Sequence, residues 1–131
     1  MFELKKRVHF EDVDYYGIIH HPKVLYYFER ARNLFFEANN IFLDRVNYSI
    51  LLKKIEIDYK CPLMMYDEIV IKQYTDKMND YKFSFKYKIF KQTKLSVNST
   101  IEFVVVDSET KKMIMLPEEI KIILAGKEEI K

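Results

Sequence analysis

The spacing of apolar residues changes along the chain, and the change separates a helix from a sheet. Between residues 24 and 38, apolar positions recur every three or four residues and so form one face of a helix. These positions are Val24, Phe28, Ala31, Phe35 and Ala38. Pro22 suits the first helical turn, and Asn39–Asn40 can adopt the left-handed conformation that ends a helix. The pattern therefore predicts an amphipathic helix from Pro22 to about Ala38.

On both sides of this helix, apolar and polar residues alternate as in half-buried strands. We expect a first strand that contains Leu4, Val8 and Phe10 and ends at Glu11. Four or five strands should follow the helix, centred on Ile55–Tyr59, Ile69–Ile71, Tyr81–Ile89, Leu95–Val105 and Met113–Met115. The residues from Pro117 to Gly126 indicate a short helix or a last edge strand. Connections of hairpin length favour antiparallel pairing.

These elements predict an α+β fold, in which an antiparallel sheet of five or six strands wraps around one long central helix. The 131 residues contain only 2 glycines and 3 prolines, which do not cluster, so we expect one domain over 1–131. Phe83, Phe85, Tyr87 and Phe103 suggest more apolar sheet surface than a monomer should expose. A homo-oligomer is therefore expected.

Charge and cysteine content restrict the possible partners and compartment. The formal net charge of +2 arises from 22 basic and 20 acidic residues, so nucleic acid is not an expected partner. The only cysteine, Cys61, cannot form an internal disulfide. No charged-then-apolar leader opens the chain, and no apolar run approaches the roughly 20 residues that span a bilayer. We expect a soluble cytoplasmic protein without an integral membrane segment.

Candidate chemistry is concentrated immediately before the predicted helix. Asp14 precedes the helix start, where its carboxylate either caps the helix or acts beside free backbone N–H groups. In the second case the N–H groups polarise a bound carbonyl while the carboxylate attacks it or activates water, as acyl transfer requires. Gly17 would let a ligand approach the backbone closely.

The histidines in this segment also have two interpretations. His20 and His21 can orient water or a carboxylate, or they can simply cap or pack against the helix. Together, His9, Asp12 and Asp14 do not form a known zinc pattern, so we expect no metal.

The residues Phe10–Asp14, Gly17–Ile19, His21 and Phe28–Arg32 resemble the hotdog-fold acyl-CoA thioesterases of the 4-hydroxybenzoyl-CoA thioesterase and YbgC-like branch. Looser similarity covers Ile57–Pro62 and Asp67–Ile69. The resemblance implies hydrolysis of an acyl-CoA thioester to a carboxylic acid and free coenzyme A, with no separate cofactor. It also implies a dimer joined edge to edge, often paired into a tetramer, with sites at the subunit interface.

The resemblance assigns roles to individual residues. Asp14 would be the catalytic nucleophile or general base, the backbone N–H of His21 would polarise the thioester carbonyl with the side chain also implicated, and Gly17 would admit the substrate. Expected substrate contacts are Tyr15, Ile19, Tyr59 and Lys60. Lys23 and Val24 stand where members of this branch commonly have Asn and Tyr, and Tyr66 stands where a glycine is common.

Several alternatives remain open from the sequence. The domain could bind acyl-CoA or an acyl carrier protein without turnover. Glu29 could be a helix carboxylate of another thioesterase mode or of a dehydratase, or it could form a surface pair with Arg32. Lys23 could meet a phosphate or be solvated. The row formed by Lys82, Lys86 and Lys88 could bind coenzyme A phosphates or an acidic carrier, or form a solvated face.

Overall fold

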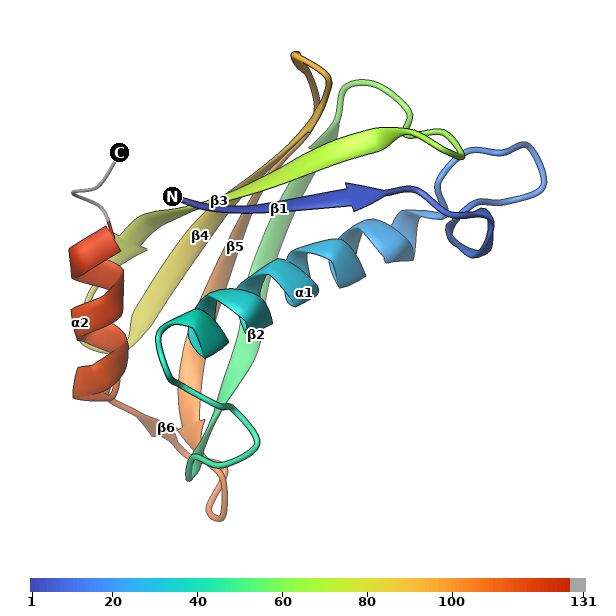
Figure 1. The fold of residues 1–131 in the computed structure, drawn as a ribbon. Helices are drawn as coiled ribbons and strands as arrows, with labels where there is room; N and C mark the ends of the chain where they lie inside the picture. Colours follow the sequence, from blue (N-terminus) through green and yellow to red (C-terminus); the bar gives the residue numbers. More distant parts are fainter. Residues whose placement is uncertain (128–131) are drawn as a thin grey trace.

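The computed structural model describes residues 1–127, which form one six-stranded antiparallel sheet and two α-helices (Figure 1). The elements in chain order are β1 (Phe2–Arg7), the short 3₁₀ turn η1 (Phe10–Asp12), α1 (His21–Ala38), β2 (Tyr48–Tyr59), β3 (Glu68–Met78), β4 (Lys82–Lys91), β5 (Lys94–Asp107), β6 (Met113–Ile114) and α2 (Glu118–Lys127).

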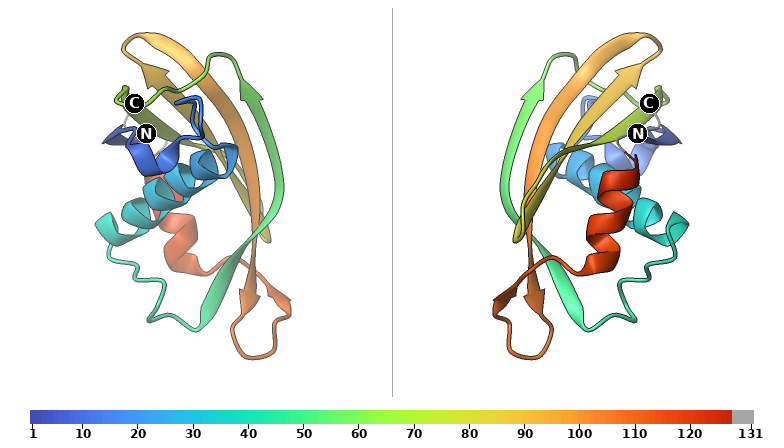
Figure 2. Two further views of the ribbon diagram at one scale, coloured as in Figure 1. Left: turned by 90° about the vertical axis from the view of Figure 1, so that its right-hand side faces the viewer. Right: turned by 90° about the vertical axis from the view of Figure 1, so that its left-hand side faces the viewer.

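The strand order is β1-β3-β4-β5-β2, and β6 pairs with the end of β5. Consecutive strands β3, β4 and β5 form hairpins, whereas β1 and β2 occupy the two edges of the main path. Figure 2 shows that the sheet bends around α1, which lies on its concave side. The predicted antiparallel sheet is therefore confirmed.

The apolar face of α1 packs on this concave side. Its buried residues are Val24, Tyr27, Phe28, Ala31, Phe35 and Phe36. Ala38, which was expected on this face, is exposed at the last position of the helix. Asn40 has a φ of 63°, so the expected left-handed stop follows directly.

The aromatic residues of the sheet are buried within the single chain. Phe83, Phe85, Tyr87 and Phe103 each have at most 1% exposure, and Phe28 of α1 stacks on Tyr87 with ring centroids 4.6 Å apart. The sequence-based argument that these rings require a partner subunit is therefore wrong, because α1 and neighbouring aromatic side chains cover them. The exposed large apolar side chains of the sheet include Leu51 and Leu52 of the β2 edge.

Two further expectations are corrected. The first strand ends at Arg7, and Phe10 lies in η1 with 74% exposure, because the chain turns there before reaching the helix. The expected single helix is 18 residues long and is joined by the 10-residue α2. Ile120 and Leu124 bury one face of α2, which resolves the final segment as a helix. In residues 1–127 we find no helix with the length and hydropathy needed to cross a bilayer.

Candidate active site

The candidate site is built on a tight loop between η1 and α1. The backbone N–H of Asp14 donates to the Ile18 carbonyl at 2.8 Å, and the Gly17 N–H donates back to the Asp14 carbonyl at 3.0 Å. Gly17 has a φ of +78°, a conformation that residues with a Cβ adopt at a cost. A Cβ at Gly17 would meet no atom within 4 Å, so backbone conformation, rather than crowding, is what this loop requires of it.

The Asp14 carboxylate is exposed and held in a fixed orientation. Its Oδ1 atom accepts the backbone N–H groups of Tyr16 at 2.8 Å and Ile18 at 3.3 Å. Its Oδ2 atom has no hydrogen-bond partner among residues 1–127. Asp14 therefore orders its own loop rather than capping α1, and one carboxylate oxygen is available to a ligand.

The start of α1 is also left without a cap. His20 is the N-cap residue, but its side chain makes no capping hydrogen bond. The His21 backbone N–H has no acceptor within the part of the chain that the structure describes. Pro22 lacks an N–H, so His21 carries the first available donor of the helix. A free N–H at the positive end of a helix dipole is suited to an oxyanion.

A hollow of about 220 Å³ lies beside this helix start. Its lining residues are Ile18, Ile19, His21, Tyr59, Lys60, Cys61, Pro62 and Leu63. The His21 ring meets the Tyr59 ring edge-on at 4.8 Å, and burial raises the pKa of Tyr59. The structure thus brings four predicted residues to the same hollow: Ile19 and His21, and, about 40 positions later in the sequence, Tyr59 and Lys60.

Tyr15 does not join this group. Its side chain is 94% exposed and meets only the neighbouring Tyr16 ring, at 5.3 Å. Lys60 lines the hollow but also pairs with Asp58 at 2.9 Å. Both residues keep their expected role of substrate contact only as a prediction.

The turn between β2 and β3 holds the site loop in position. Ile19 donates its backbone N–H to Leu63 at 2.8 Å, and Met65 donates to Gly17 at 3.0 Å. Tyr66 has a φ of 75°, so it adopts the left-handed backbone of the glycine that is common at this position. This turn was not assigned a role from sequence, although the unusual residue at position 66 marked it.

Sequence reasoning also underestimated Asp12 and Lys23. Asp12 is 6% exposed and accepts hydrogen bonds from the Tyr27 hydroxyl at 2.8 Å and the His9 N–H at 3.2 Å. Lys23 Nζ lies 3.9 Å from Asp12 and 5.6 Å from the centre of the Tyr26 ring, so its side chain is not simply solvated. The sequence feature that could have indicated these contacts is Asp12 itself, a second acidic residue two positions before Asp14.

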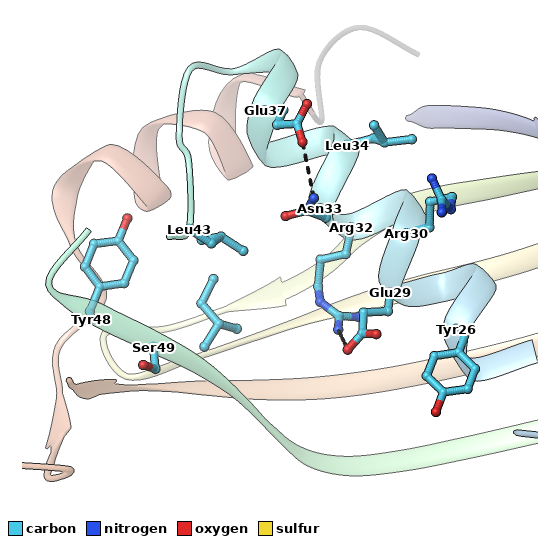
Figure 3. Close-up of a pocket in the computed structure, with 11 residues that line it drawn as sticks. Tyr26, Glu29, Arg30, Arg32, Asn33, Leu34, Glu37, Leu43, Tyr48 and Ser49 are labelled. Carbon is cyan, nitrogen blue, oxygen red and sulfur yellow. Dashed lines mark hydrogen bonds and ion pairs between the residues drawn. The ribbon is translucent and has the colours of Figure 1, made fainter. Parts of the chain in front are cut away.

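A larger hollow, about 790 Å³, lies elsewhere, between α1 and the first half of β2 (Figure 3). It includes Glu29 and Arg32, whose charged groups are 3.9 Å apart as the surface-pair interpretation expected. It contains neither Asp14 nor the helix start. We therefore place the candidate chemistry beside the smaller hollow, which is lined by His21 and by Ile18 and Ile19 of the preceding loop, although Asp14 itself is not among its lining residues.

The lysine row lies on the opposite side of the sheet. Lys86 pairs with Asp76 at 3.8 Å and Lys88 lies 5.8 Å from the centre of the Tyr74 ring, while the alternating Phe83, Phe85 and Tyr87 point into the core. Among residues 1–127, no group of three or more His, Cys, Asp or Glu side chains is placed to hold a metal ion.

Comparison with known proteins shows the family to which the chain belongs. Residues 8–124 match the model of the thioesterase-like superfamily. The acyl-CoA thioesterase YbgC of Haemophilus influenzae is 24% identical over 124 residues, covering 92% of this chain and 91% of that protein.

Solved structures show the same fold. A 1,4-dihydroxy-2-naphthoyl-CoA thioesterase from Synechocystis has a TM-score of 0.88 at 16% identity, covering 95% of both chains. A Staphylococcus aureus protein solved in complex with CoA has a TM-score of 0.89 at 15% identity, covering 97% of this chain and 83% of that one. Together with the family match over most of its length, this fold confirms that the chain belongs to the thioesterase-like superfamily, with similarity to its YbgC branch.

Proposed function

We propose that this protein hydrolyses an acyl-CoA thioester to a carboxylic acid and free coenzyme A. The observation that carries the proposal is that one short segment contains both a carboxylate with a free oxygen, Asp14, and an uncapped helix start with a free N–H, His21. Family membership and the activity named for the YbgC relative support the same reaction.

In the proposed reaction, the thioester carbonyl oxygen accepts a hydrogen bond from the His21 N–H. As the carbonyl becomes tetrahedral, this oxygen gains negative charge, which the N–H and the helix dipole stabilise. Gly17 supports the reaction by allowing the turn that aims the Asp14 carboxylate. The hydrogen bonds from Tyr16 and Ile18 to Asp14 Oδ1 leave Oδ2 as the reacting atom.

Asp14 can act in either of two ways, as a nucleophile or as a general base. As nucleophile, Oδ2 attacks the carbonyl carbon, the C–S bond breaks, and the departing thiolate takes a proton; water then hydrolyses the acyl-aspartyl anhydride. As general base, Asp14 removes a proton from water, whose hydroxide attacks the same carbon and expels the thiolate, which is then protonated. Both routes use the same carboxylate and give the same products.

The hollow supplies the surroundings for the thioester. Ile18, Ile19 and Leu63 provide apolar walls, and Tyr59 stands against the His21 ring. Lys60 provides a positive charge for the phosphates of coenzyme A or of an acyl carrier protein. Dehydration is a weaker candidate, because Glu29 pairs with Arg32 and contacts no histidine within the described chain.

We further propose that two copies join through β2 into a dimer, which can pair into a tetramer. β2 is an edge strand, and its Leu51 and Leu52 side chains are 46% and 49% exposed. An exposed edge with large apolar side chains favours pairing with a second strand. The half-buried, unpaired Cys61 fits a reducing compartment such as the cytoplasm, where we expect the protein to act.

A panel of acyl-CoAs separates an enzyme from a binding domain. Free thiol release and equilibrium binding are measured for short, long and aromatic acyl-CoAs with the purified protein. Catalysed release from at least one acyl-CoA is expected. Tight binding of acyl-CoA without release from any member of the panel would favour the non-catalytic alternative and contradict the proposal.

A further inference from the structure

Helix α1 leaves part of strand β2 uncovered, and a groove follows this gap. We call it the α1–β2 groove; it has a volume of about 270 Å³ and is lined by Pro22, Leu25, Glu29, Arg32, Leu52 and Ile101, among others. It begins at Pro22, next to the free N–H of His21. At its other end it shares Glu29 and Arg32 with the larger hollow (Figure 3).

The two ends of the groove differ in chemistry. The end near the helix start has apolar walls from Pro22, Leu25 and Leu52. At the far end, Figure 3 shows the Glu29 and Arg32 side chains directed from α1 toward β2, with a dashed contact between them. A ligand that enters from the helix start therefore meets an apolar channel before it meets a pair of charges.

Arg32 has more hydrogen-bond donors than the chain satisfies. Its side chain is only 14% exposed and lies 4.6 Å from the centre of the Phe103 ring, and its nearest carboxylate is Glu29 at 3.9 Å. The Tyr87 hydroxyl can accept from one of the five guanidinium donors, and no other side chain within residues 1–127 is placed to accept from the rest. A guanidinium removed from water with donors left over is unfavourable, so this position favours an acceptor supplied by another molecule.

Tyr87 lies behind Arg32 in the core. Its side chain is completely buried. Burial raises the pKa of Tyr87, while the charge of Arg32 and a hydrogen bond with it oppose this effect, which places the guanidinium beside the hydroxyl. Tyr87 is not among the residues that line the groove, so it supports Arg32 from the buried side.

The length of the groove limits the size of the ligand. Arg32 follows His21 by about three helical turns, or roughly 16 Å along the axis. Helical side chains lean toward the N-terminus, so the guanidinium lies closer to the helix start than its Cα does. An acyl group that extends from the helix start to this guanidinium is longer than a single aromatic ring.

The charges of Glu29 and Arg32 at the far end of the groove determine which polar group of a ligand fits there. A hydroxyl can accept a hydrogen bond from Arg32 and donate one to Glu29, whereas a methyl group does neither. A carboxylate would be attracted by Arg32 but repelled by Glu29. We propose that the α1–β2 groove binds the acyl chain of the substrate and that the Glu29–Arg32 pair selects an acyl chain with a hydroxyl at its far end. This inference rests on the proposed thioesterase function.

Three substrates of equal chain length test the inference: octanoyl-CoA, 8-hydroxyoctanoyl-CoA and the mono-CoA thioester of octanedioic acid. For the wild-type protein, we expect kcat/KM for the hydroxyl-terminated substrate to exceed that for octanoyl-CoA by about ten-fold, the effect of one hydrogen bond to a charged group. The carboxyl-terminated substrate should be slower than the hydroxyl-terminated one.

Substitutions of Arg32 and Glu29 test whether these two residues cause the preference for the hydroxyl-terminated substrate. Arg32→Met should bring the ratio of hydroxyl-terminated to octanoyl kcat/KM close to one. Glu29→Gln should raise the relative rate on the carboxyl-terminated substrate, because it removes a like charge. Arg45→Met is the matched control, because Arg45 is 72% exposed in a loop outside the groove, and it should leave all ratios unchanged.

Each outcome bears on the inference. If wild type releases thiol from these substrates at equal kcat/KM, the inference fails while the proposed function stands. If Arg32→Met retains the preference but converts an oligomer to a monomer, Arg32 is a contact between copies and the inference also fails. If Arg32→Met does not fold, the Glu29→Gln ratio decides, since that side chain is 65% exposed. Absence of hydrolysis of all three substrates would overturn the inference alone if another member of the acyl-CoA panel is hydrolysed, and both proposals if none is.

Discussion

The Tyr27 hydroxyl donates a 2.8 Å hydrogen bond to Asp12 Oδ2 and thereby joins α1 to the turn that precedes the candidate site. Both residues are buried, with 3% and 6% exposure. The same Asp12 accepts the His9 N–H, and its carbonyl accepts the N–H of His20 at 2.8 Å. The carboxylate of Asp12 thus joins the turn to the helix, and its backbone carbonyl holds the residue before α1, two positions before Asp14.

Tyr27→Phe should destabilise the protein by about 1.5–3 kcal/mol, the range for a hydrogen bond to a charged group. The ring remains, so the packing of α1 is retained. The measurement is the free energy of unfolding in urea. Tyr26→Phe is the matched control, because Tyr26 is 60% exposed and makes no side-chain hydrogen bond among the described residues; it should change stability by less than about 0.5 kcal/mol. Equal effects of the two changes would contradict the role of this bond.

The same tyrosine should make stability depend on alkaline pH. Burial, then the hydrogen bond and charge of Asp12, raise the pKa of Tyr27 above its ordinary value of 10.0. The folded protein therefore retains a proton that the unfolded chain releases, and stability present below pH 10 is lost as the pH rises further. The difference in unfolding free energy between wild type and Tyr27→Phe should shrink above pH 10. A difference that is constant from pH 8 to pH 11 would contradict this assignment.

Tyr66 offers a test of backbone strain in the turn that supports the site loop. Its φ of 75° disfavours any residue with a Cβ by roughly 1–2 kcal/mol relative to the ordinary region, and only glycine avoids this penalty. Tyr66→Gly and Tyr66→Ala both remove the ring, which lies 5.3 Å from the Arg7 guanidinium. The glycine variant should be more stable than the alanine variant by about 1 kcal/mol in thermal or urea unfolding. A more stable alanine variant would show that the turn is not strained.

Much of the fold could be predicted from periodicity, because periodicity reports which side of an element is apolar. It predicted α1, its stop at Asn39–Asn40, and the succession of strands along the chain. The expected meander was wrong for β2, which pairs with β5 and not with β3. Periodicity does not show what covers the apolar side of an element, so Phe83 and its neighbours were expected to need a partner subunit although they are buried within the single chain. Ala38 was placed on the buried face because the apolar spacing continues to the last residue of the helix, where the side chain is exposed.

Only the part of the site that lies within one short segment of the chain could be predicted from the sequence. The segment from Asp14 to His21 is local, so its loop and helix start followed from residue types. The buried position of Asp12 depends on Tyr27, 15 positions later, and alternation gives no sign of such a contact. The exposure of Tyr15 likewise follows from the direction of the loop, which is set by backbone bonds to Leu63 and Met65.

The oligomeric state can be tested at the β2 edge. Leu51→Lys combined with Leu52→Lys places two charges on the edge strand where the proposed dimer forms and should convert a dimer or tetramer into monomers. Light scattering at micromolar concentration measures the mass. Ile122→Lys is the control, because Ile122 is 61% exposed on α2, away from this edge, and should leave the mass unchanged. A wild-type monomer under the same conditions would contradict the proposed dimer.

The most direct test of the central claim is the rate of free thiol release from an acyl-CoA by wild type, Asp14→Asn and Asp44→Asn. Asparagine preserves the size of the Asp14 side chain and can still accept the Tyr16 and Ile18 N–H groups, but it is neither a nucleophile nor a base. We predict that Asp14→Asn lowers kcat at least about 100-fold, in the range typical of lost acid–base or nucleophilic catalysis. Asp44 is 81% exposed in a loop, and its variant should retain the wild-type rate. Full activity of Asp14→Asn would contradict the assignment of this carboxylate as the catalytic group.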